Sequence, residues 1–153
     1  MFIDSDIAWK SQDLLRLLTW NQPLVGGAYQ LKSEELSFGV KFSSEIISRN
    51  GLLITNRLAT GFLRIRRDAL DSMINNAGEI GLRQYLYDQG KKKLYAFFDT
   101  LIVDNKYVGE DYFFSDLWKK NGGEVLLDPE LKLQHIGTRV YEESILDYLK
   151  RNT

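Results

Sequence analysis

Met1-Phe2-Ile3-Asp4-Ser5-Asp6 joins a short apolar strand to two carboxylates that end it. On an extended backbone, side chains two residues apart point to the same side, roughly 6.5–7 Å apart at about 3.3 Å rise per residue. A turn at the strand end brings them closer, so Asp4 and Asp6 could share a divalent cation. Magnesium and manganese favour oxygen ligands, and their charge would in turn hold a diphosphate. In the other interpretation, the two acids only end the strand and begin a loop.

Strands alternate with helices along the rest of the chain, which indicates an α/β protein. Turn signals such as Asn50-Gly51 lie between strand-like segments and predict hairpins, so we expect a mixed sheet with flanking helices. The apolar spacing predicts helices over residues 11–20, 67–77, 110–121 and 141–149, and strands over 24–29, 36–42, 52–55, 59–66, 94–103, 124–127 and 131–136.

Two local details follow from the same patterns. Ser11 is the expected N-cap of the first helix. The apolar face of that helix is expected to comprise Leu14, Leu15, Leu17 and Leu18. We interpret the run Lys91–Lys93 as a solvated loop.

Composition and charge exclude several classes of protein. The length of 153 residues and a hydrophobic share of 44% predict one globular domain over residues 1–153. Lys plus Arg (20) nearly balance Asp plus Glu (21), so the net charge of −1 gives no electrostatic reason to expect a nucleic-acid or anionic-membrane surface. The absence of cysteine excludes thiolate chemistry, and a single histidine excludes a multi-histidine metal site. Without a long apolar run or a signal segment, we expect a cytoplasmic protein with no transmembrane segment and no nucleic-acid partner.

Two further groups of residues carry candidate chemistry. Glu110 and Asp111 open the helix expected over residues 110–121, where the positive partial charge of a helix N-terminus favours ionised carboxylates. Asp111 would serve there as a base, an electrostatic stabiliser or an acceptor for a substrate hydroxyl, unless the pair only stabilises the first turn. His135 ends an apolar strand, where its imidazole would join the aspartates as a nitrogen ligand or bind phosphate. In the other interpretation, His135 is an ordinary core or surface residue without a role in chemistry.

In their order along the chain, these motifs resemble the metal-dependent nucleotide-sugar glycosyltransferases of the GT-A fold, particularly small bacterial and phage members similar to family 2. The segments that carry the resemblance are Phe2–Asp6, Val25–Tyr29, Ala59–Phe62, Gly109–Phe114 and Leu133–Thr138. The resemblance implies a partial GT-A (nucleotide-diphospho-sugar transferase) fold. It also implies an enzyme that transfers a sugar from a nucleotide-sugar donor to a hydroxyl of a glycan, lipid or protein acceptor.

The resemblance further implies a role for each candidate residue. Asp6, with Asp4 acting through water or the donor ribose, would hold Mn²⁺ or Mg²⁺, and His135 would complete the protein ligands. The cation would neutralise the charge that grows on the diphosphate as the sugar leaves. Asp111 would be the catalytic carboxylate, a base if the enzyme inverts and an orienting group if it retains, and Glu110 would position hydroxyl groups beside it.

Several small or aromatic residues are expected to line the same site. Gly26, Gly27 and Gly61 would let the backbone approach a ligand closely, with Thr60 beside them. Trp9 would stack on a sugar face, because aromatic rings offer an apolar platform to C–H groups. Ordinary turn and packing glycines remain the alternative.

In the family, a nucleotide-binding βαβ half precedes the Asp-x-Asp strand. The resemblance in this chain begins at that strand, so the chain is expected to represent the C-terminal metal and acceptor part of a GT-A domain. We therefore expect an open sheet edge and weak or absent donor binding by this chain alone. A fragment, a half supplied by a separate chain and an inactive relative are the open explanations.

Two other functions stay open from the sequence. A noncatalytic sugar-binding or interaction module would use the acceptor face without metal chemistry. A sugar nucleotidyltransferase would also use acidic metal ligands, but the chain shows no Gly-rich basic phosphate loop near its N-terminus.

Overall fold

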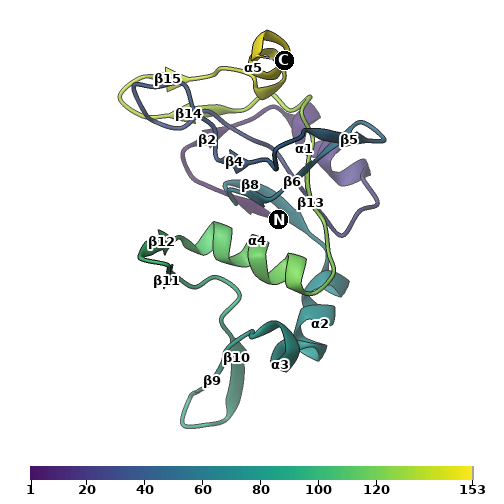
Figure 1. Cartoon of the computed structure of the whole chain (residues 1–153), viewed down its shortest axis with the longest axis vertical. Coiled ribbons are helices and arrows are strands. Elements are labelled where there is room, and N and C mark those ends of the chain that lie inside the picture. The colour runs from purple at the N-terminus through teal and green to yellow at the C-terminus, as the bar shows by residue number, and fades with distance from the viewer. Residues whose placement is uncertain (153) are drawn as a thin grey trace.

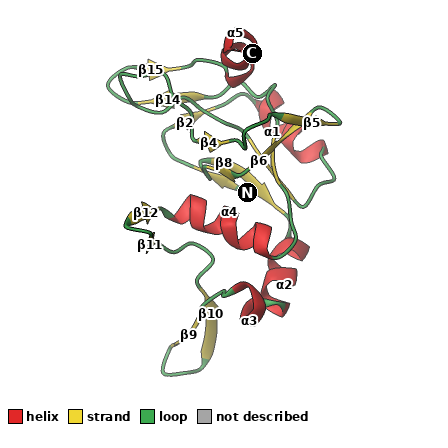
Figure 2. Ribbon diagram, in the orientation of Figure 1, coloured by secondary structure: helices red, strands yellow, loops and turns green. Residues whose placement is uncertain are grey.

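The computed structural model describes residues 1–152 and contains a mixed α/β fold built on a six-stranded sheet (Figure 1 and Figure 2). In spatial order the strands are β1 (Phe2–Ile3), β8 (Phe62–Ile65), β3 (Leu24–Gly26), β13 (Val125–Leu127), β6 (Leu52–Thr55) and β5 (Ile47–Arg49). Only β3 and β13 pair in parallel, and the other neighbouring strands of this sheet are antiparallel. The expected mixed sheet is therefore confirmed.

Helices cover both faces of this sheet because neighbouring residues of its strands are apolar on both sides. Along β3, Leu24 packs into the core on one face and Val25 into the core on the other. The helices are α1 (Ser11–Thr19), α2 (Arg67–Asn75), α3 (Ala77–Ile80), α4 (Glu110–Lys120) and α5 (Ile145–Asn152). Leu17 of α1 packs on the Val25 face, whereas α2, α3, α4 and α5 contribute to the core on the Leu24 face. None of these helices, within residues 1–152, is long and apolar enough to cross a membrane.

Small sheets surround the main one. They are formed by β15 (Val140–Tyr141), β14 (Gln134–Ile136) and β2 (Ile7–Ala8), by β4 (Val40–Lys41) with β7 (Arg57–Leu58), by β9 (Gln84–Tyr87) with β10 (Lys92–Tyr95), and by β11 (Leu101–Val103) with β12 (Lys106–Val108). In the first of these sheets, His135 pairs with Ile7. This register brings the late histidine strand beside the Asp4-Ser5-Asp6 turn.

Strand β1 forms one open edge of the main sheet. Among the described strands, β1 pairs only with β8, so its outer backbone edge has no strand partner. The ring of Phe98 packs against Phe2, with centroids 5.1 Å apart, and also stacks on Phe114 of α4 at 4.8 Å. Aromatic packing thus joins this edge to the helix that carries Asp111.

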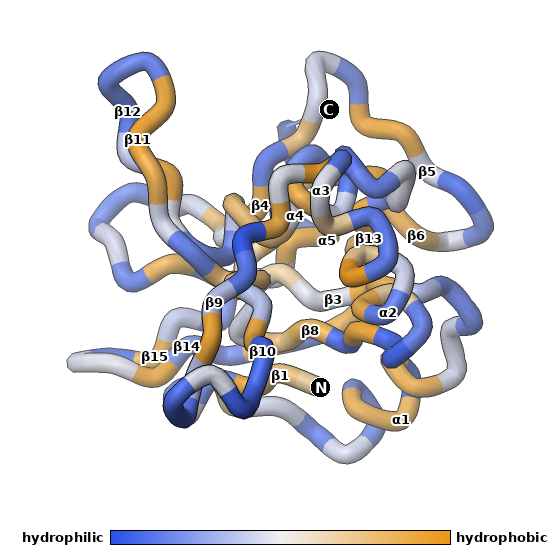
Figure 3. The backbone as a smooth tube through the Cα atoms, turned by 90° about the horizontal axis from the view of Figure 1, so that it is seen from below, coloured by the Kyte–Doolittle hydropathy of each residue, from blue (hydrophilic) through white to orange (hydrophobic). Residues whose placement is uncertain are grey.

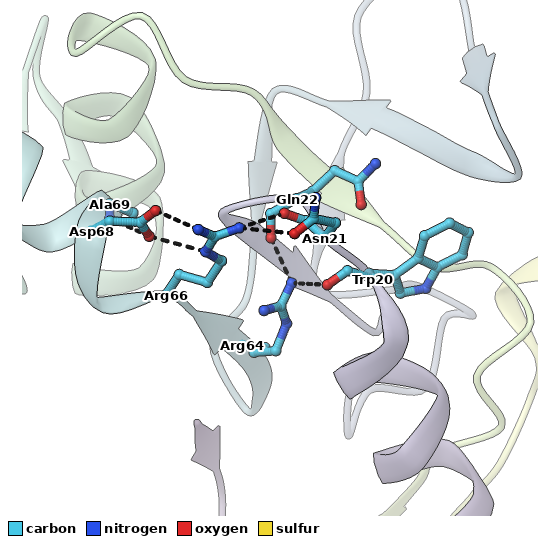
Figure 4. Close-up of polar contacts among 7 residues, drawn as sticks. All are labelled: Trp20, Asn21, Gln22, Arg64, Arg66, Asp68 and Ala69. Atoms are coloured by element: carbon cyan, nitrogen blue, oxygen red, sulfur yellow. Dashed lines mark hydrogen bonds and ion pairs between the residues drawn. The ribbon is translucent and has the colours of Figure 1, made fainter.

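Two arginines hold the loop that connects α1 to β3 (Figure 4). Arg64 of β8 donates from Nη2 to the carbonyl oxygens of Trp20 (2.7 Å) and Gln22 (2.5 Å). Arg66 donates from Nη1 to the carbonyl oxygen of Asn21 at 2.8 Å. Because these carbonyls belong to one short loop, the contacts fix the entry of β3 into the sheet beside β8.

Two predictions about the first helix, α1, are wrong: its N-cap residue and the extent of its buried face. Its N-cap is Lys10 rather than Ser11, and the backbone N–H of Lys10 donates to the Asp13 carboxylate at 2.8 Å. Leu17 is buried, but Leu15 and Leu18 are exposed, so the packed face is narrower than the four predicted leucines. The buried face is narrow because α1 contacts the sheet through a single row of side chains that includes Leu17.

Three further boundaries differ from expectation. Lys92 and Lys93 lie in strand β10, not in a loop, because they pair with Tyr87 and Leu86 of β9, a strand the sequence did not predict. The final helix begins at Ile145, since Tyr141 belongs to strand β15. The strand expected over residues 36–42 is limited to β4, with an isolated bridge between Gln30 and Phe38.

Candidate functional site

The Asp4-Ser5-Asp6 turn connects the main sheet to the small sheet that holds His135. The backbone N–H of Asp4 donates to the carbonyl of Gly61 at 2.9 Å, and the N–H of Ile7 donates to the carbonyl of Asp4 at 3.1 Å. The carbonyl of Asp6 accepts the N–H of Ile136 at 2.8 Å. Backbone bonds therefore anchor Asp4 beside Gly61 and Asp6 beside the histidine strand.

Asp111 lies in the first turn of α4, whose N-cap is Gly109. Its carboxylate oxygen Oδ1 accepts a hydrogen bond of 2.5 Å from Thr60 Oγ1, and its carbonyl accepts one of 3.1 Å from Ser115 Oγ. Thr60 directly precedes Gly61, whose carbonyl holds Asp4. The same backbone segment thus positions carboxylates that are far apart in the sequence.

Position 61 holds a glycine because two polar side chains leave no room for a Cβ atom there. A Cβ atom at this position would lie 2.4 Å from the Tyr29 hydroxyl oxygen and 2.8 Å from Asp4 Oδ2, closer than atoms can approach. Burial raises the pKa of the Tyr29 hydroxyl, and the charges of Asp4 and Asp111 raise this pKa further. Tyr29 therefore stays protonated, as a neutral hydrogen-bond donor beside the carboxylates.

The His135 imidazole is held in one orientation. Its Nδ1 lies 2.9 Å from the carbonyl oxygen of Gln30, which can only accept, so Nδ1 carries a proton. Nε2 lies 3.4 Å from Asp6 Oδ2, and the ring packs edge-on against Tyr29 with centroids 5.0 Å apart. The bond to Gln30 thus leaves Nε2 free to pair with the Asp6 carboxylate or to act as a ligand.

Lys32 completes the surroundings of Asp6. Its ammonium donates to Asp6 Oδ2 at 2.6 Å. This hydrogen bond lowers the pKa of the Asp6 carboxyl. Neither Lys32, which lies 26 residues from Asp6, nor the side chain of Tyr29 is predicted to belong to the site, because only tertiary folding brings them to the carboxylates.

The carboxylates gather around Asp4, and we call Asp4, Asp6, Glu110 and Asp111 the acidic cluster. Burial raises the pKa of the Asp4 carboxyl, and the nearby charges of Asp111, Asp6 and, least, Glu110 raise this pKa further. The charge of His135 acts on the same pKa in the opposite direction. These like charges repel one another, and the Lys32 ammonium offsets part of the negative charge at Asp6.

Asp4→Asn is expected to stabilise the fold at pH 7. Because the pKa of Asp4 is raised on folding, its contribution to stability is present below the unfolded pKa and is lost as the pH rises through the folded pKa. The neutral amide avoids that loss, so the urea midpoint should rise at pH 7. The gain should vanish at pH values below the unfolded pKa of about 3.9.

Urea unfolding of wild type, Asp4→Asn and the exposed control Asp71→Asn at both pH values checks this expectation. An Asp4→Asn midpoint at or below that of wild type at pH 7 would show that the carboxylates around Asp4 do not repel it.

Across residues 1–152, no three Asp, Glu or His side chains are arranged as a ready metal site. Asp6 Oδ2 and His135 Nε2 lie 3.4 Å apart, and Lys32 also bonds to that oxygen. Magnesium in nucleotide sites is usually bound by one or two carboxylates plus phosphates and water, so any cation here would need ligands from a substrate.

Core leucines pack closely against Gly26 and Gly27. A Cβ atom on Gly26 would lie 2.8 Å from a Leu58 methyl, and one on Gly27 would lie 2.7 Å from a Leu133 methyl. Both glycines are buried. This close packing explains why both positions hold glycine, and their expected role as site walls stays a prediction.

Trp9 packs on the core and lines a separate pocket. Its ring packs against Phe62 with centroids 6.1 Å apart. The other side of the residue lines a shallow pocket of about 240 Å³ with Lys10, Gln134 and Glu142, and no member of the acidic cluster lines this pocket. The structure therefore gives Trp9 no contact with the carboxylates it was expected to accompany.

Comparison with known proteins informs the fold. No protein-family model matches the chain, and no curated protein matches its sequence. Among solved structures, the crystal structure of A197 from STIV superposes with a TM-score of 0.50 at 18% identity, covering 94% of this chain and 64% of that chain. This chain thus spans 64% of the length of that structure. At this identity the likeness concerns the fold alone, which the chain shares as a mixed α/β arrangement.

Proposed function

We propose that this chain is a metal-dependent glycosyltransferase of the GT-A type, or a part of one, which transfers a sugar from a nucleotide sugar to a hydroxyl acceptor. The observation that carries the proposal is the meeting of the Asp4-Ser5-Asp6 turn, the start of α4 and His135 around one acidic cluster. These residues come from the two ends of the chain and from a late helix. The resemblance of the motifs predicts the same set.

Asp6 and His135 would hold the cation, and Asp4 would act through water or the donor ribose. A bound Mn²⁺ or Mg²⁺ supplies Lewis-acid stabilisation of the diphosphate leaving group. Lys32 shares Asp6 Oδ2 with that site, so its ammonium competes with the cation for one oxygen. The bond from the His135 ring to Gln30 keeps Nε2 directed at the site.

Asp111 is proposed as the catalytic carboxylate. The Thr60 hydroxyl donates to one carboxylate oxygen of Asp111 at 2.5 Å and so fixes the orientation of this side chain. The carboxylate would take the proton of the acceptor hydroxyl in an inverting reaction, or orient the reacting groups in a retaining one. Glu110, its neighbour in the first turn, would position hydroxyl groups.

The nucleotide-binding half would come from residues outside this chain, in a longer protein or in a separate partner chain. A cytoplasmic location belongs to the same proposal. The partners would be the nucleotide-sugar donor and a glycan, lipid or protein acceptor.

Mn²⁺ binding tests the proposed metal site. Isothermal titration should show weak binding of Mn²⁺ to the wild-type chain and a loss of about 10–100-fold in affinity for Asp6→Asn and for His135→Gln. Lys32→Met should bind several-fold more tightly, because the competing ammonium is removed. Asp71→Asn and Lys41→Met, on exposed positions elsewhere, serve as matched controls. Equal affinity of wild type and Asp6→Asn would contradict the proposed site.

A noncatalytic sugar-binding module is the second candidate, favoured by a hollow with aromatic walls. This hollow of about 590 Å³ lies between β9–β10 and the segment that follows, and its walls include Tyr85, Tyr95, Phe97 and Phe98. Aromatic faces bind the C–H surface of sugars without a metal. Glycan binding that survives Asp6→Ala and chelation would support the module, whereas the transferase requires its loss.

A further inference from the structure

Two hairpins expose large apolar side chains away from the core. Ile102, Tyr107 and Leu86 are 74%, 72% and 68% exposed. Figure 1 shows the β9–β10 and β11–β12 hairpins leaving the body on the α4 side of the main sheet, and Figure 3 shows the apolar β11 strand standing clear of the interior. The β9–β10 hairpin alone exposes Tyr85, Leu86 and Tyr87, and exposed apolar residues gathered on one projection mark an interaction surface.

The register of β9–β10 sorts apolar and basic side chains onto the same face. Tyr87 pairs with Lys92, and Tyr85 pairs with Leu94. Because alternate residues of a strand share a face, these four side chains lie together. One face of the hairpin thus combines two tyrosines and a leucine with a lysine.

The charge of the two hairpins differs in sign from that of the whole chain. Their residues include Lys91, Lys92, Lys93 and Lys106, against Asp88 and Asp104, whereas the chain carries a net charge of −1. In the described part of the chain, no ion pair involves any of these lysines. The net charge alone led us to expect no anionic-membrane surface, but three of these lysines, Lys91, Lys92 and Lys93, follow one another in the β9–β10 hairpin.

We propose that the β9–β10 hairpin docks this protein on a membrane surface that contains anionic lipids. Tyrosine suits the headgroup region because its ring is apolar and its hydroxyl is polar, and leucine enters the acyl boundary. The lysines contact the lipid phosphates. A symmetric contact between two copies of this surface would bring like charges together, which disfavours self-association as its use.

Vesicle co-sedimentation with the whole chain tests this proposal independently of glycosyl transfer. Wild type should bind vesicles of phosphatidylcholine mixed with phosphatidylglycerol and should not bind pure phosphatidylcholine vesicles. The triple variant Lys91→Gln, Lys92→Gln, Lys93→Gln should bind at least tenfold more weakly, since each lysine near an anionic surface contributes about fivefold. The double variant Leu86→Ser, Leu94→Ser, which removes apolar side chains of the same hairpin, should also lose binding by about tenfold.

The controls separate this surface from the rest of the molecule. Leu15→Ser removes an exposed leucine of α1 and should leave vesicle binding unchanged. Asp6→Asn should also keep vesicle binding, so failure of the proposed metal site and failure of the membrane surface are distinguishable. Circular dichroism verifies that each variant is folded. Equal binding to neutral vesicles, no binding to either kind, or a hairpin-dependent dimer in light scattering would overturn the proposal.

Discussion

Asp111→Asn should lower the rate of sugar transfer by about 10²–10⁴-fold, the usual contribution of a positioned acid or base. The amide has nearly the same shape as the carboxylate and can still accept the hydrogen bond from Thr60 Oγ1. It cannot accept a proton or carry the negative charge. The fold and Mn²⁺ affinity should therefore stay close to wild type while the chemical step slows.

The measurement is the initial rate of transfer from a panel of nucleotide sugars, made with the protein or complex that includes the nucleotide-binding region. Thr60→Val is the matched variant, because it removes the hydrogen bond to Asp111 and keeps the carboxylate. It should reduce the rate by about tenfold, as expected for a positioning residue. If Asp111→Asn retains the wild-type rate while Asp6→Asn is inactive, Asp111 only stabilises the first turn of α4.

Local patterns predicted the longer helices and the central strands of the main sheet, and they marked the carboxylates that we propose as functional. The spacing of Phe113, Phe114, Leu117 and Trp118 predicts α4, and each of these residues is buried. The Asp4-Ser5-Asp6 turn follows β1, and Asp111 opens α4, as strand-end and helix-start signals indicate. Such features depend on neighbours in the sequence, which is why they are readable there.

Contacts between distant segments were not predictable in the same way. Lys32 reaches Asp6 only because the chain after β3 folds back over the turn, and no periodicity records that path. Gly26 and Gly27 are set by leucines from other elements, so a packing glycine and a ligand-contacting glycine look identical in sequence. The β9 strand is exposed on both faces and therefore lacks the apolar alternation that reveals a strand.

Asp128→Ala should destabilise the protein by about 3 kcal/mol, which is the lower end of the loss for a broken buried ion pair. The Asp128 side chain is fully buried and lies directly after β13. Its Oδ2 accepts hydrogen bonds of 2.7 Å from Arg16 Nε and from Trp20 Nε1, and its Oδ1 accepts one of 3.1 Å from the backbone N–H of Glu130. One carboxylate thus joins α1 to the centre of the main sheet.

Alanine would leave these donors without their acceptor and would create a small cavity. The loss stays near the lower end because the Arg16 side chain is 42% exposed, so water can solvate its freed charge. At 153 residues, this change corresponds to a fall in Tm of about 6–12 °C.

Thermal and urea unfolding of Asp128→Ala and of Asp68→Ala provide the comparison. Asp68 also pairs with an arginine, Arg66, at 2.6 Å, but its side chain is 59% exposed. Because water and salt screen such a pair, its removal should cost less than about 1 kcal/mol. If the two variants lose equal stability, burial does not strengthen the Asp128 contacts, and the apolar stripe around Leu17 must hold α1 on the sheet by itself.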